Sequence, residues 1–294
     1  MMRKGVILAG GTGSRLHPVT QAVSKQLLPV YDKPLIYYPL SVLMLAGIRE
    51  ILLICRSADQ HLFQRLLGDG SRLGLQISYA SQDEARGVAD ALLVGESFIQ
   101  DAPVCLILGD NIFYGDSFSA LVTEATAHVT GAQLFAYYVS DPQRYGVVEF
   151  DRAGRPVALE EKPAHPRSNY AVTGMYWYDG RAVELARTLR PSARGELEIT
   201  ELNRLYLDRG ELDVTLLGRG IGWLDVGTHD ALQEASAFVA AIERRTSLKV
   251  CCPEEIAFRK GYIDRRELAA LAVEIADTDY GRYLAGLVES LDAG

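Results

Sequence analysis

Three glycines and an arginine lie close together near the start of the chain, in the segment GGTGSR at positions 10–15. Glycine lets a backbone come close to a phosphate group, and successive backbone N–H groups form a concave site for an anion. Arg15 adds a planar cation whose geometry suits phosphate oxygens. The segment therefore predicts binding of a nucleoside triphosphate or another phosphorylated ligand, with a tight turn that binds nothing as the alternative.

This glycine-rich segment differs from two familiar phosphate-binding motifs. Counted from Gly11, it lacks the third glycine of G-x-G-x-x-G, which a dinucleotide-binding loop requires. The chain also contains no Gly-Lys-Ser or Gly-Lys-Thr, the tripeptide that ends a Walker loop. The segment therefore fits neither of these two motifs.

Two carboxylates are candidate metal ligands. Asp110 follows the apolar run 104–108 and Gly109, and Asp225 follows Gly-Trp-Leu at 222–224. Mg²⁺ prefers one or two carboxylates together with phosphate oxygens of a substrate. The pattern indicates Asp110 and Asp225 as Mg²⁺ ligands, and the alternative for each is a turn or cap residue.

Three cations and one further carboxylate are candidates for ligand contact. Lys25 lies shortly after the glycine-rich segment and can reach a phosphate as a point charge, unless it is a solvated surface lysine. Lys162 is a second candidate, and its alternative role is a salt bridge with a neighbouring residue. Arg194 is the third candidate, and its alternative role is a surface charge near a helix cap. Strand alternation places Glu161 on the same face as residues 157 and 159, where a carboxylate must be paired or bind sugar hydroxyls.

Composition narrows the class of protein. The 294 residues carry a formal net charge of −8, which argues against nonspecific nucleic-acid binding. The hydrophobic fraction of 48% is typical of a globular protein, and no stretch is long and apolar enough to predict a membrane span. The four cysteines form no C-x-x-C pair and show no zinc spacing. We expect a cytoplasmic protein without nucleic-acid or membrane partners.

The first half of the chain alternates between strand and helix patterns. Apolar runs predict strands at 5–9, 50–55, 76–79 and 104–108. Helical patterns lie between them at 34–46, 60–67 and 89–98, with Pro34 suited to a first helical turn. Such alternation predicts a parallel sheet with helices on both faces, and ligands bind beyond the carboxyl ends of such strands. The glycine-rich segment and Asp110 both lie at those ends.

The second half is more mixed. Strands are predicted at 132–139, 146–150, 157–161, 172–178 and 212–217, and helices at 182–189 and 198–207. From Thr228 the chain is predicted to be helical, and Asp264 with Glu267 resembles a capping box. The fold class predicted is α/β, with a Rossmann-like mixed, mostly parallel sheet flanked by helices. We divide it into a body at 1–227 and a helical C-terminal region at 228–294.

Several motifs together resemble those of the glucose-1-phosphate thymidylyltransferases, a branch of the sugar nucleotidyltransferases. They are GGTGSRL at 10–16, KQLLP at 25–29, LGDN at 108–111, EEKP at 160–163, RGELEIT at 194–200, WLD at 223–225 and PEEIA at 253–257. The glycine-rich segment and LGDN alone indicate only a sugar nucleotidyltransferase. The segments YDKP at 31–34, YYPLS at 37–41 and RYGVVE at 144–149 narrow the resemblance to the thymidylyltransferase branch.

The resemblance implies a nucleotidyltransferase fold and a reaction in which dTTP and glucose 1-phosphate give dTDP-glucose and pyrophosphate. The sugar phosphate attacks the α-phosphorus in line, with Mg²⁺, and no covalent enzyme intermediate is needed. The reaction begins the dTDP-L-rhamnose route or another dTDP-deoxysugar route. The resemblance also implies a homotetramer, which dTDP-L-rhamnose inhibits at a second site in the C-terminal region, near a subunit interface.

The resemblance assigns roles residue by residue. The catalytic residues are Arg15, Lys25, Asp110, Lys162 and Asp225, of which Asp110 and Asp225 hold Mg²⁺. The nucleotide is bound by Leu8, Gly10, Gly11, Thr12, Gly13, Ser14, Arg15, Lys25, Gln26, Gln82, Gly87 and Asp110. The sugar phosphate is bound by Asn111, Tyr145, Gly146, Glu161, Lys162, Val172, Arg194, Glu196 and Trp223. The regulatory site contains Tyr114, Gly115, Arg219, Glu255, Ile256 and Arg259.

The sequence departs from the family pattern next to Gly87, one of the residues that the resemblance assigns to the nucleotide. Val88 and Asp90 stand where the family more often has Leu and Gln, which leaves base and sugar selectivity open. One alternative is a sister enzyme that uses UTP or another sugar 1-phosphate, because a single pocket methyl contact discriminates by only about 1–3 kcal/mol. Another alternative is a nucleotide-sugar sensor without turnover. The joint presence of four residues argues against it, namely Arg15, Asp110, Lys162 and Asp225.

Overall fold

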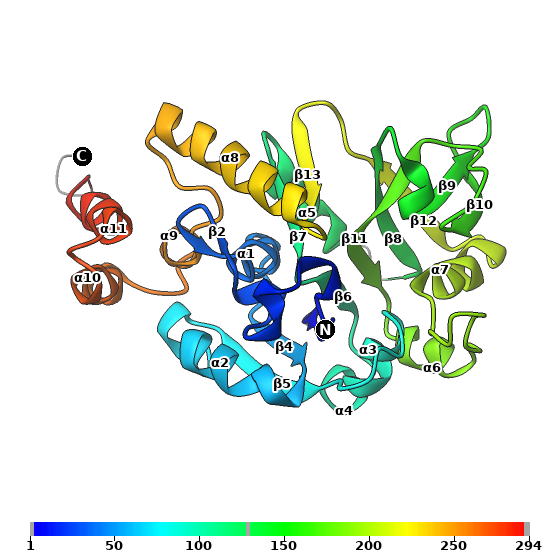
Figure 1. Cartoon of the computed structure of the whole chain (residues 1–294), viewed down its shortest axis with the longest axis horizontal. Coiled ribbons are helices and arrows are strands. Elements are labelled where there is room, and N and C mark those ends of the chain that lie inside the picture. Colours follow the sequence, from blue (N-terminus) through cyan, green and yellow to red (C-terminus); the bar gives the residue numbers. More distant parts are fainter. Residues whose placement is uncertain (1–2, 128–129, 291–294) are drawn as a thin grey trace.

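The structure is a computed structural model, and it describes residues 3–127 and 130–290. Four parallel strands form the centre of the molecule. They lie in the order β5-β4-β1-β6 (Figure 1). Their bounds are β1 Lys4–Ala9, β4 Glu50–Cys55, β5 Gln76–Ser81 and β6 Val104–Leu108. Leu8 pairs with Leu108, so the segments that follow β1 and β6 leave the sheet side by side. The four predicted strands and their parallel arrangement are confirmed.

The helix predicted at 34–46 begins later than expected. Pro34 belongs to a short hairpin, and the two N–H groups that follow it donate to the carbonyls of Leu28 and Gln26 at 2.9 and 2.8 Å. These hydrogen bonds hold the chain against the preceding segment, so a helix start at Pro34 was the wrong prediction. The hairpin and helix are β2 Pro29–Val30, β3 Lys33–Pro34 and α1 Tyr37–Leu45.

The remaining helices of the first half lie between the strands, and α2, α3 and α4 connect parallel strands of the central sheet. The pattern at 89–98 forms two short helices divided at Gly95 rather than one. The α-helices are α2 Ser57–Leu67, α3 Asp90–Val94, α4 Glu96–Ile99 and α5 Phe118–Ala125. The 3-10 helices are η1 Ser14–Leu16, η2 Val19–Gln21, η3 Lys25–Leu27 and η4 Ser71–Leu73.

The second half extends the same sheet, mostly with antiparallel pairs, although β12 pairs parallel with β8. Strand β11 (Tyr170–Tyr178) pairs antiparallel with β6, and then with β8 and β9 along its length. The other strands are β8 Ala132–Tyr138, β9 Gly146–Phe150, β10 Pro156–Glu161 and β12 Leu212–Leu216. The helical elements are η5 Pro142–Arg144, α6 Ala182–Arg187 and α7 Ile199–Asp208. The predicted fold class is confirmed.

A separate two-stranded ribbon, which the sequence analysis did not predict, joins the two halves. It pairs β7 (Asn111–Gly115) antiparallel with β13 (Ile221–Asp225), so that Asp225 lies opposite Asn111. The backbone N–H of Val226 donates to the carbonyl of Asp110 at 3.0 Å. The ribbon therefore brings the two candidate metal carboxylates together from distant parts of the chain.

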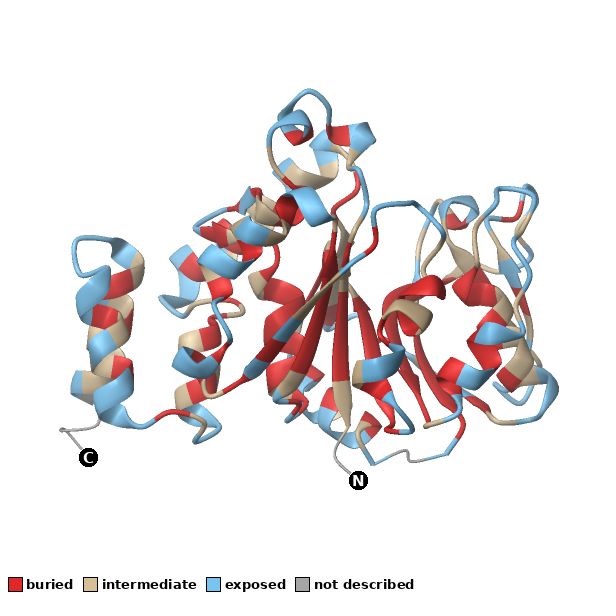
Figure 2. Ribbon diagram, turned by 90° about the horizontal axis from the view of Figure 1, so that it is seen from below, coloured by how far each residue is buried: buried red, intermediate tan, exposed pale blue. Residues whose placement is uncertain are grey.

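The sheet separates two hydrophobic cores (Figure 2). Neighbouring residues of one strand face opposite cores: Ile7 packs with α1, α2 and α5, whereas Val6 packs with α3, α6 and α7. Trp177 and Tyr178 divide between the cores in the same way. Because the central strands are buried on both faces, their positions are closely held, and the loops at their ends are held with them.

Helices make up the described end of the chain. They are α8 His229–Thr246, α9 Pro253–Arg259, α10 Arg265–Glu274 and α11 Asp279–Ser290. The predicted capping box is confirmed, because Asp264 accepts from the backbone of Glu267 and the Glu267 carboxylate accepts in return. In the described part of the chain, no helix combines the length and apolar character that crossing a membrane requires. The division of the chain at residue 227 stays a prediction.

A buried ion network fastens α8 to the β2–β3 hairpin. The Lys33 ammonium, whose side chain is only 1% exposed, lies 2.9 Å from the Glu243 carboxylate near the end of α8. Glu243 also accepts from Lys249 at 2.8 Å and from the backbone of Val250 at 2.9 Å. Asp32 completes the network between the two lysines. The C-terminal helices are thereby tied to the segment that follows Lys25.

Candidate active site

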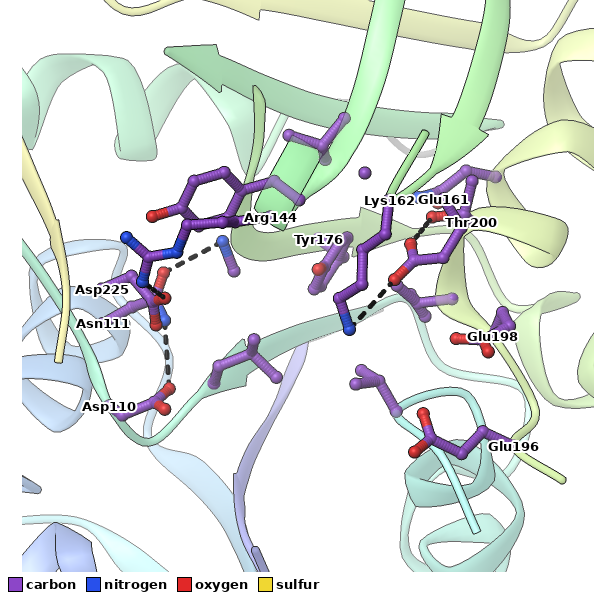
Figure 3. A pocket seen from close by; sticks show the side chains of 18 of the residues that line it. Asp110, Asn111, Arg144, Glu161, Lys162, Tyr176, Glu196, Glu198, Thr200 and Asp225 are labelled. Carbon is purple, nitrogen blue, oxygen red and sulfur yellow. Dashed lines mark hydrogen bonds and ion pairs between the residues drawn. The ribbon is translucent and has the colours of Figure 1, made fainter. Parts of the chain in front are cut away.

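One cavity of about 510 Å³ collects predicted site residues from both halves of the chain. Figure 3 shows the Asp110 and Asp225 carboxylates on one side of it and the Lys162 and Glu161 side chains facing them from the other. All residues predicted to bind a sugar phosphate are in its lining. The predicted residues that line it are Arg15, Asp110, Asn111, Tyr145, Gly146, Glu161, Lys162, Val172, Arg194, Glu196, Trp223 and Asp225.

The two carboxylates have different electrostatic surroundings. Burial would raise the pKa of Asp110, but the Lys25 ammonium in direct contact with its Oδ2 overcomes this effect and lowers it. Burial and then the nearby Asp110 charge raise the pKa of Asp225 to about 6. The Lys25, Arg15 and Arg144 charges partly offset this rise in pKa. Of these, Arg144 forms an ion pair with Asp225 at 4.0 Å. A carboxylate pair of this kind favours a cation placed between its members.

The donor set fits Mg²⁺ bound partly by a substrate. Carboxylate oxygens are the hard ligands that this ion prefers, and it commonly takes one or two of them plus phosphate oxygens and water. Within residues 3–127 and 130–290, no group of three or more histidine, cysteine or acidic side chains is arranged to hold a metal. Two carboxylates that line a cavity of about 510 Å³ therefore suit an ion that arrives with a phosphorylated substrate.

Asn111 links the metal carboxylates to the wall of the cavity. Its Oδ1 accepts from Trp223 Nε1 at 2.6 Å and from the backbone of Gly174 at 3.1 Å, while its Nδ2 donates to Asp110 at 3.1 Å. A Cβ at Gly174 would lie 2.6 Å from that oxygen, so glycine is needed there. The Trp223 ring in turn packs 5.1 Å from Tyr145. The Asn111 side chain holds the site together, and its predicted contact with a sugar phosphate stays a prediction.

Asn111→Leu is expected to lower the free energy of unfolding by about 2 kcal/mol, because it leaves the buried N–H of Gly174 and the half-buried ring N–H of Trp223 without an acceptor. Urea denaturation measures the change. The loss should be smaller in a Trp223→Phe background, since phenylalanine has no ring N–H to strand. An equal loss in both backgrounds would contradict the assigned hydrogen bond.

The opposite side of the cavity carries a charged cluster around Glu161. Thr200 Oγ1 donates to Glu161 Oε2 at 2.5 Å, and Arg194 Nη2 and Lys162 Nζ lie 3.3 and 3.5 Å from Oε1. A Cβ at Gly146 would come within 2.9 Å of Thr200 Oγ1, so glycine leaves this cluster room. The arrangement offers an acceptor for hydroxyl groups next to cations for a phosphate.

The predicted face of Glu161 was partly wrong. Leu159 is buried and Glu161 lines the cavity, but Val157 is 53% exposed and does not share their surroundings. The pairing of β9 with β10 shifts its register between Pro156 and Ala158. This irregularity interrupts the simple alternation on which the prediction rested.

Most of the residues predicted to bind the nucleotide lie in segments that contact one another. Gly10 approaches Gln82, whose Nε2 donates to Asp90 at 2.7 Å. The departure at Asp90 therefore has a definite role, which is to hold the Gln82 amide. Gly87 adopts a φ of 104° against the backbone of residue 197, where a side chain would not fit. The other members lie on β1, on the loop after it and on η3, and they are Leu8, Gly11, Thr12, Gly13, Ser14, Lys25 and Gln26.

The cavity also contains side chains that the sequence analysis did not select. Tyr176 could have been found, because strand alternation places it on the same face as Val172 and Gly174. Thr200 lies within the RGELEIT motif at 194–200, but the sequence analysis assigns it no role of its own. The residues not selected are Leu108, Arg144, Gly174, Tyr176, Glu198, Ile199, Thr200 and Asn203, and Val88 was noted only as a departure.

The predicted regulatory residues fall into two groups outside the cavity lining. Gly115 pairs with Ile221 on the β7–β13 ribbon, next to the turn that carries Arg219, and Tyr114 packs 6.0 Å from Phe238. The second group lies on α9, where Glu255 accepts from Arg259 Nε at 2.6 Å. That group consists of Glu255, Ile256 and Arg259. The regulatory site stays a prediction.

Comparisons with known proteins agree with this arrangement. The model of the nucleotidyl transferase family matches residues 4–242. The chain is 57% identical to a glucose-1-phosphate thymidylyltransferase of Xanthomonas campestris pv. campestris strain B100, over 98% of this chain and 97% of the relative. It is 52% identical to the protein of that name from Mycobacterium tuberculosis strain H37Rv, over 97% of this chain and 99% of the relative.

Solved structures show the same fold. A protein of Bacillus anthracis, crystallised with sucrose, aligns with a TM-score of 0.75 at 42% identity, over 80% of this chain and 94% of that chain. A UDP-glucose pyrophosphorylase bound to UDP-glucose aligns with a TM-score of 0.72 at 24% identity, over 83% of this chain and all of that chain, and supports the fold alone. The chain belongs to the nucleotidyl transferase family, in the branch of the glucose-1-phosphate thymidylyltransferases.

Proposed function

We propose that the protein transfers a deoxythymidylyl group from dTTP to glucose 1-phosphate, which yields dTDP-glucose and pyrophosphate. A phosphate oxygen of the sugar phosphate forms a bond to the α-phosphorus, and the bond from that phosphorus to the β-phosphate oxygen breaks. The observation that carries the proposal is the cavity in which two carboxylates face the Glu161 cluster. Such a transfer needs alignment and charge neutralisation rather than a protein nucleophile.

Different residues in and around the cavity would bind the two substrates. Lys162 and Arg194 would hold and orient the sugar phosphate, while Glu161 would accept hydrogen bonds from glucose hydroxyls. Arg15 and the glycine-rich segment would hold the triphosphate, and Arg15 would offset the charge that grows on the leaving pyrophosphate. The close fit of Arg15 over Gly227, where a Cβ would lie 3.1 Å from Nη2, supports a defined guanidinium position.

Asp110 and Asp225 would hold the Mg²⁺ ion that the carboxylate pair fits. When bound, the ion supplies positive charge to the reacting phosphate oxygens. Asn111 fixes the carboxylate of Asp110 through its amide group, which keeps one ligand oriented before the substrates arrive.

The proposal extends to the surroundings of the reaction. It includes a cytoplasmic homotetramer, a place at the first step of dTDP-L-rhamnose or another dTDP-deoxysugar synthesis, and inhibition by dTDP-L-rhamnose at the two groups of regulatory residues. These points rest on the resemblance of the sequence to the family.

A product assay tests the proposed reaction. We expect pyrophosphate release that requires dTTP, glucose 1-phosphate and Mg²⁺ together, and that EDTA abolishes. Equal rates with UTP or with another sugar 1-phosphate would instead assign a sister nucleotidyltransferase. Binding of dTTP without pyrophosphate release for any sugar phosphate would assign a nucleotide-sugar sensor.

A further inference from the structure

Lys25 occupies a position that a metal ion would need. Its ammonium contacts Oδ2 of Asp110, while Oδ1 of the same carboxylate accepts from Asn111 Nδ2 at 3.1 Å. Both oxygens of the carboxylate are therefore engaged. The Lys25 side chain is 10% exposed, so this ion pair is weakly screened by water.

The second carboxylate is not covered in this way. Arg144 Nη2 lies 4.0 Å from Asp225, whereas Arg144 Nη1 lies 2.9 Å from Asp141 outside the cavity lining. The Arg144 guanidinium is thus committed mainly to another partner and more exposed than Lys25. Lys25 is therefore in direct contact with Asp110, whereas Arg144 lies farther from Asp225.

The backbone position of Lys25 also matters for its access to a triphosphate bound at the glycine-rich segment. It lies on η3, where its carbonyl accepts from the backbone of Leu28 at 3.0 Å, so the backbone is held while the side chain can turn. The next residue, Gln26, packs against Gly109, whose backbone N–H donates to the carbonyl of Leu8 at 2.9 Å. Lys25 thus lies beside Asp110, on a segment that contacts the carboxyl ends of β1 and β6, which the glycine-rich segment and Asp110 follow.

We propose that Lys25 is an internal counterion that occupies Asp110 in the free enzyme and suppresses binding of a divalent cation until a triphosphate draws the ammonium away. The inference rests on the metal site of the proposed function. The Lys25 ammonium would first neutralise the Asp110 carboxylate and would then bind the phosphates of the nucleotide. The free enzyme would accordingly bind the cation weakly, and cation and nucleotide would enter together.

Titration with Mn²⁺ in the absence of nucleotide, followed by electron paramagnetic resonance of the free ion, tests the proposal. Lys25→Met should bind Mn²⁺ at least about tenfold more tightly than the wild type, because the ammonium no longer competes with the metal ion for the Asp110 carboxylate and no longer repels it. Lys25→Gln provides a second variant in case the first folds poorly, and thermal unfolding checks both.

Arg144→Met is the matched control, since it removes one positive charge beside the other of the two metal carboxylates. Its affinity for Mn²⁺ should change by less than about threefold, because its cation is distant and exposed. The gain from Lys25→Met should vanish when Asp110→Asn is added, which removes the contact that Lys25 makes.

Three results would overturn the proposal. They are equal affinity in the wild type and both Lys25 variants, an equal gain in Arg144→Met, and a gain that persists with Asp110→Asn. Absence of Mn²⁺ binding in every variant, even with dTTP added, would remove the metal site itself, and the proposal with it.

Discussion

Asp225→Asn is expected to lower kcat by about 10³-fold or more, because an amide keeps the shape of the carboxylate but not the charge that holds Mg²⁺. The same change should leave the fold intact and raise its free energy of unfolding by about 1 kcal/mol at neutral pH, since it removes a buried charge next to Asp110. Steady-state pyrophosphate release and thermal unfolding of the metal-free protein measure the two effects.

The opposite direction of the two effects makes the Asp225 prediction specific. A residue that only supports the fold would lose activity together with stability. Asp208→Asn, which changes an exposed carboxylate at the end of α7, is the control of equal charge and should alter neither quantity. Near-normal kcat at limiting Mg²⁺ in Asp225→Asn would remove this residue from the metal site.

Lys162→Ala is expected to lower kcat/KM for glucose 1-phosphate by about 10²-fold, while KM for dTTP changes by less than about threefold. The reason is that Lys162 lies with Arg194 beside Glu161, on the side of the cavity that faces the Asp110–Asp225 pair. Initial rates measured while each substrate is varied in turn separate the two effects.

The backbone of Lys162 provides a matched variant. Its φ of 44° lies in the left-handed region, and its N–H donates to the carbonyl of Tyr145 at 2.9 Å. Glycine adopts such a φ without strain, so Lys162→Gly should be more stable than Lys162→Ala by about 1 kcal/mol and equally poor with glucose 1-phosphate. A rise in KM for dTTP alone would assign Lys162 to the nucleotide instead.

The parts of the site that local pattern alone predicted most directly lie where a motif coincides with the end of a strand, whereas many other roles came from the family resemblance. The glycine-rich segment and Asp110 each follow a buried apolar run, and parallel strands bring their carboxyl ends to the same edge of the sheet. These two features needed only local pattern and one general rule of topology.

The remaining parts depend on pairing between distant segments. Asp225 comes beside Asp110 only because β13 pairs with β7, and neither strand carries a strong alternating pattern. The Glu161 cluster depends on Thr200, which reaches it from α7, and the shift at Pro156 depends on a local irregularity between β9 and β10. A single sequence contains no signal for such pairings, because they are decided by packing of the whole sheet.

The buried ion network at Lys33 has a consequence for synthesis of the protein on the ribosome. Glu243, its partner on α8, is made 210 residues later. At typical rates of synthesis this interval lasts about 10–40 s. During that time Val30, Tyr38 and Ile112, which pack against α8 in the finished protein, have no cover from that helix. The ion network around Lys33 is therefore completed late in synthesis, and this apolar surface lacks the cover of α8 until that helix has been made.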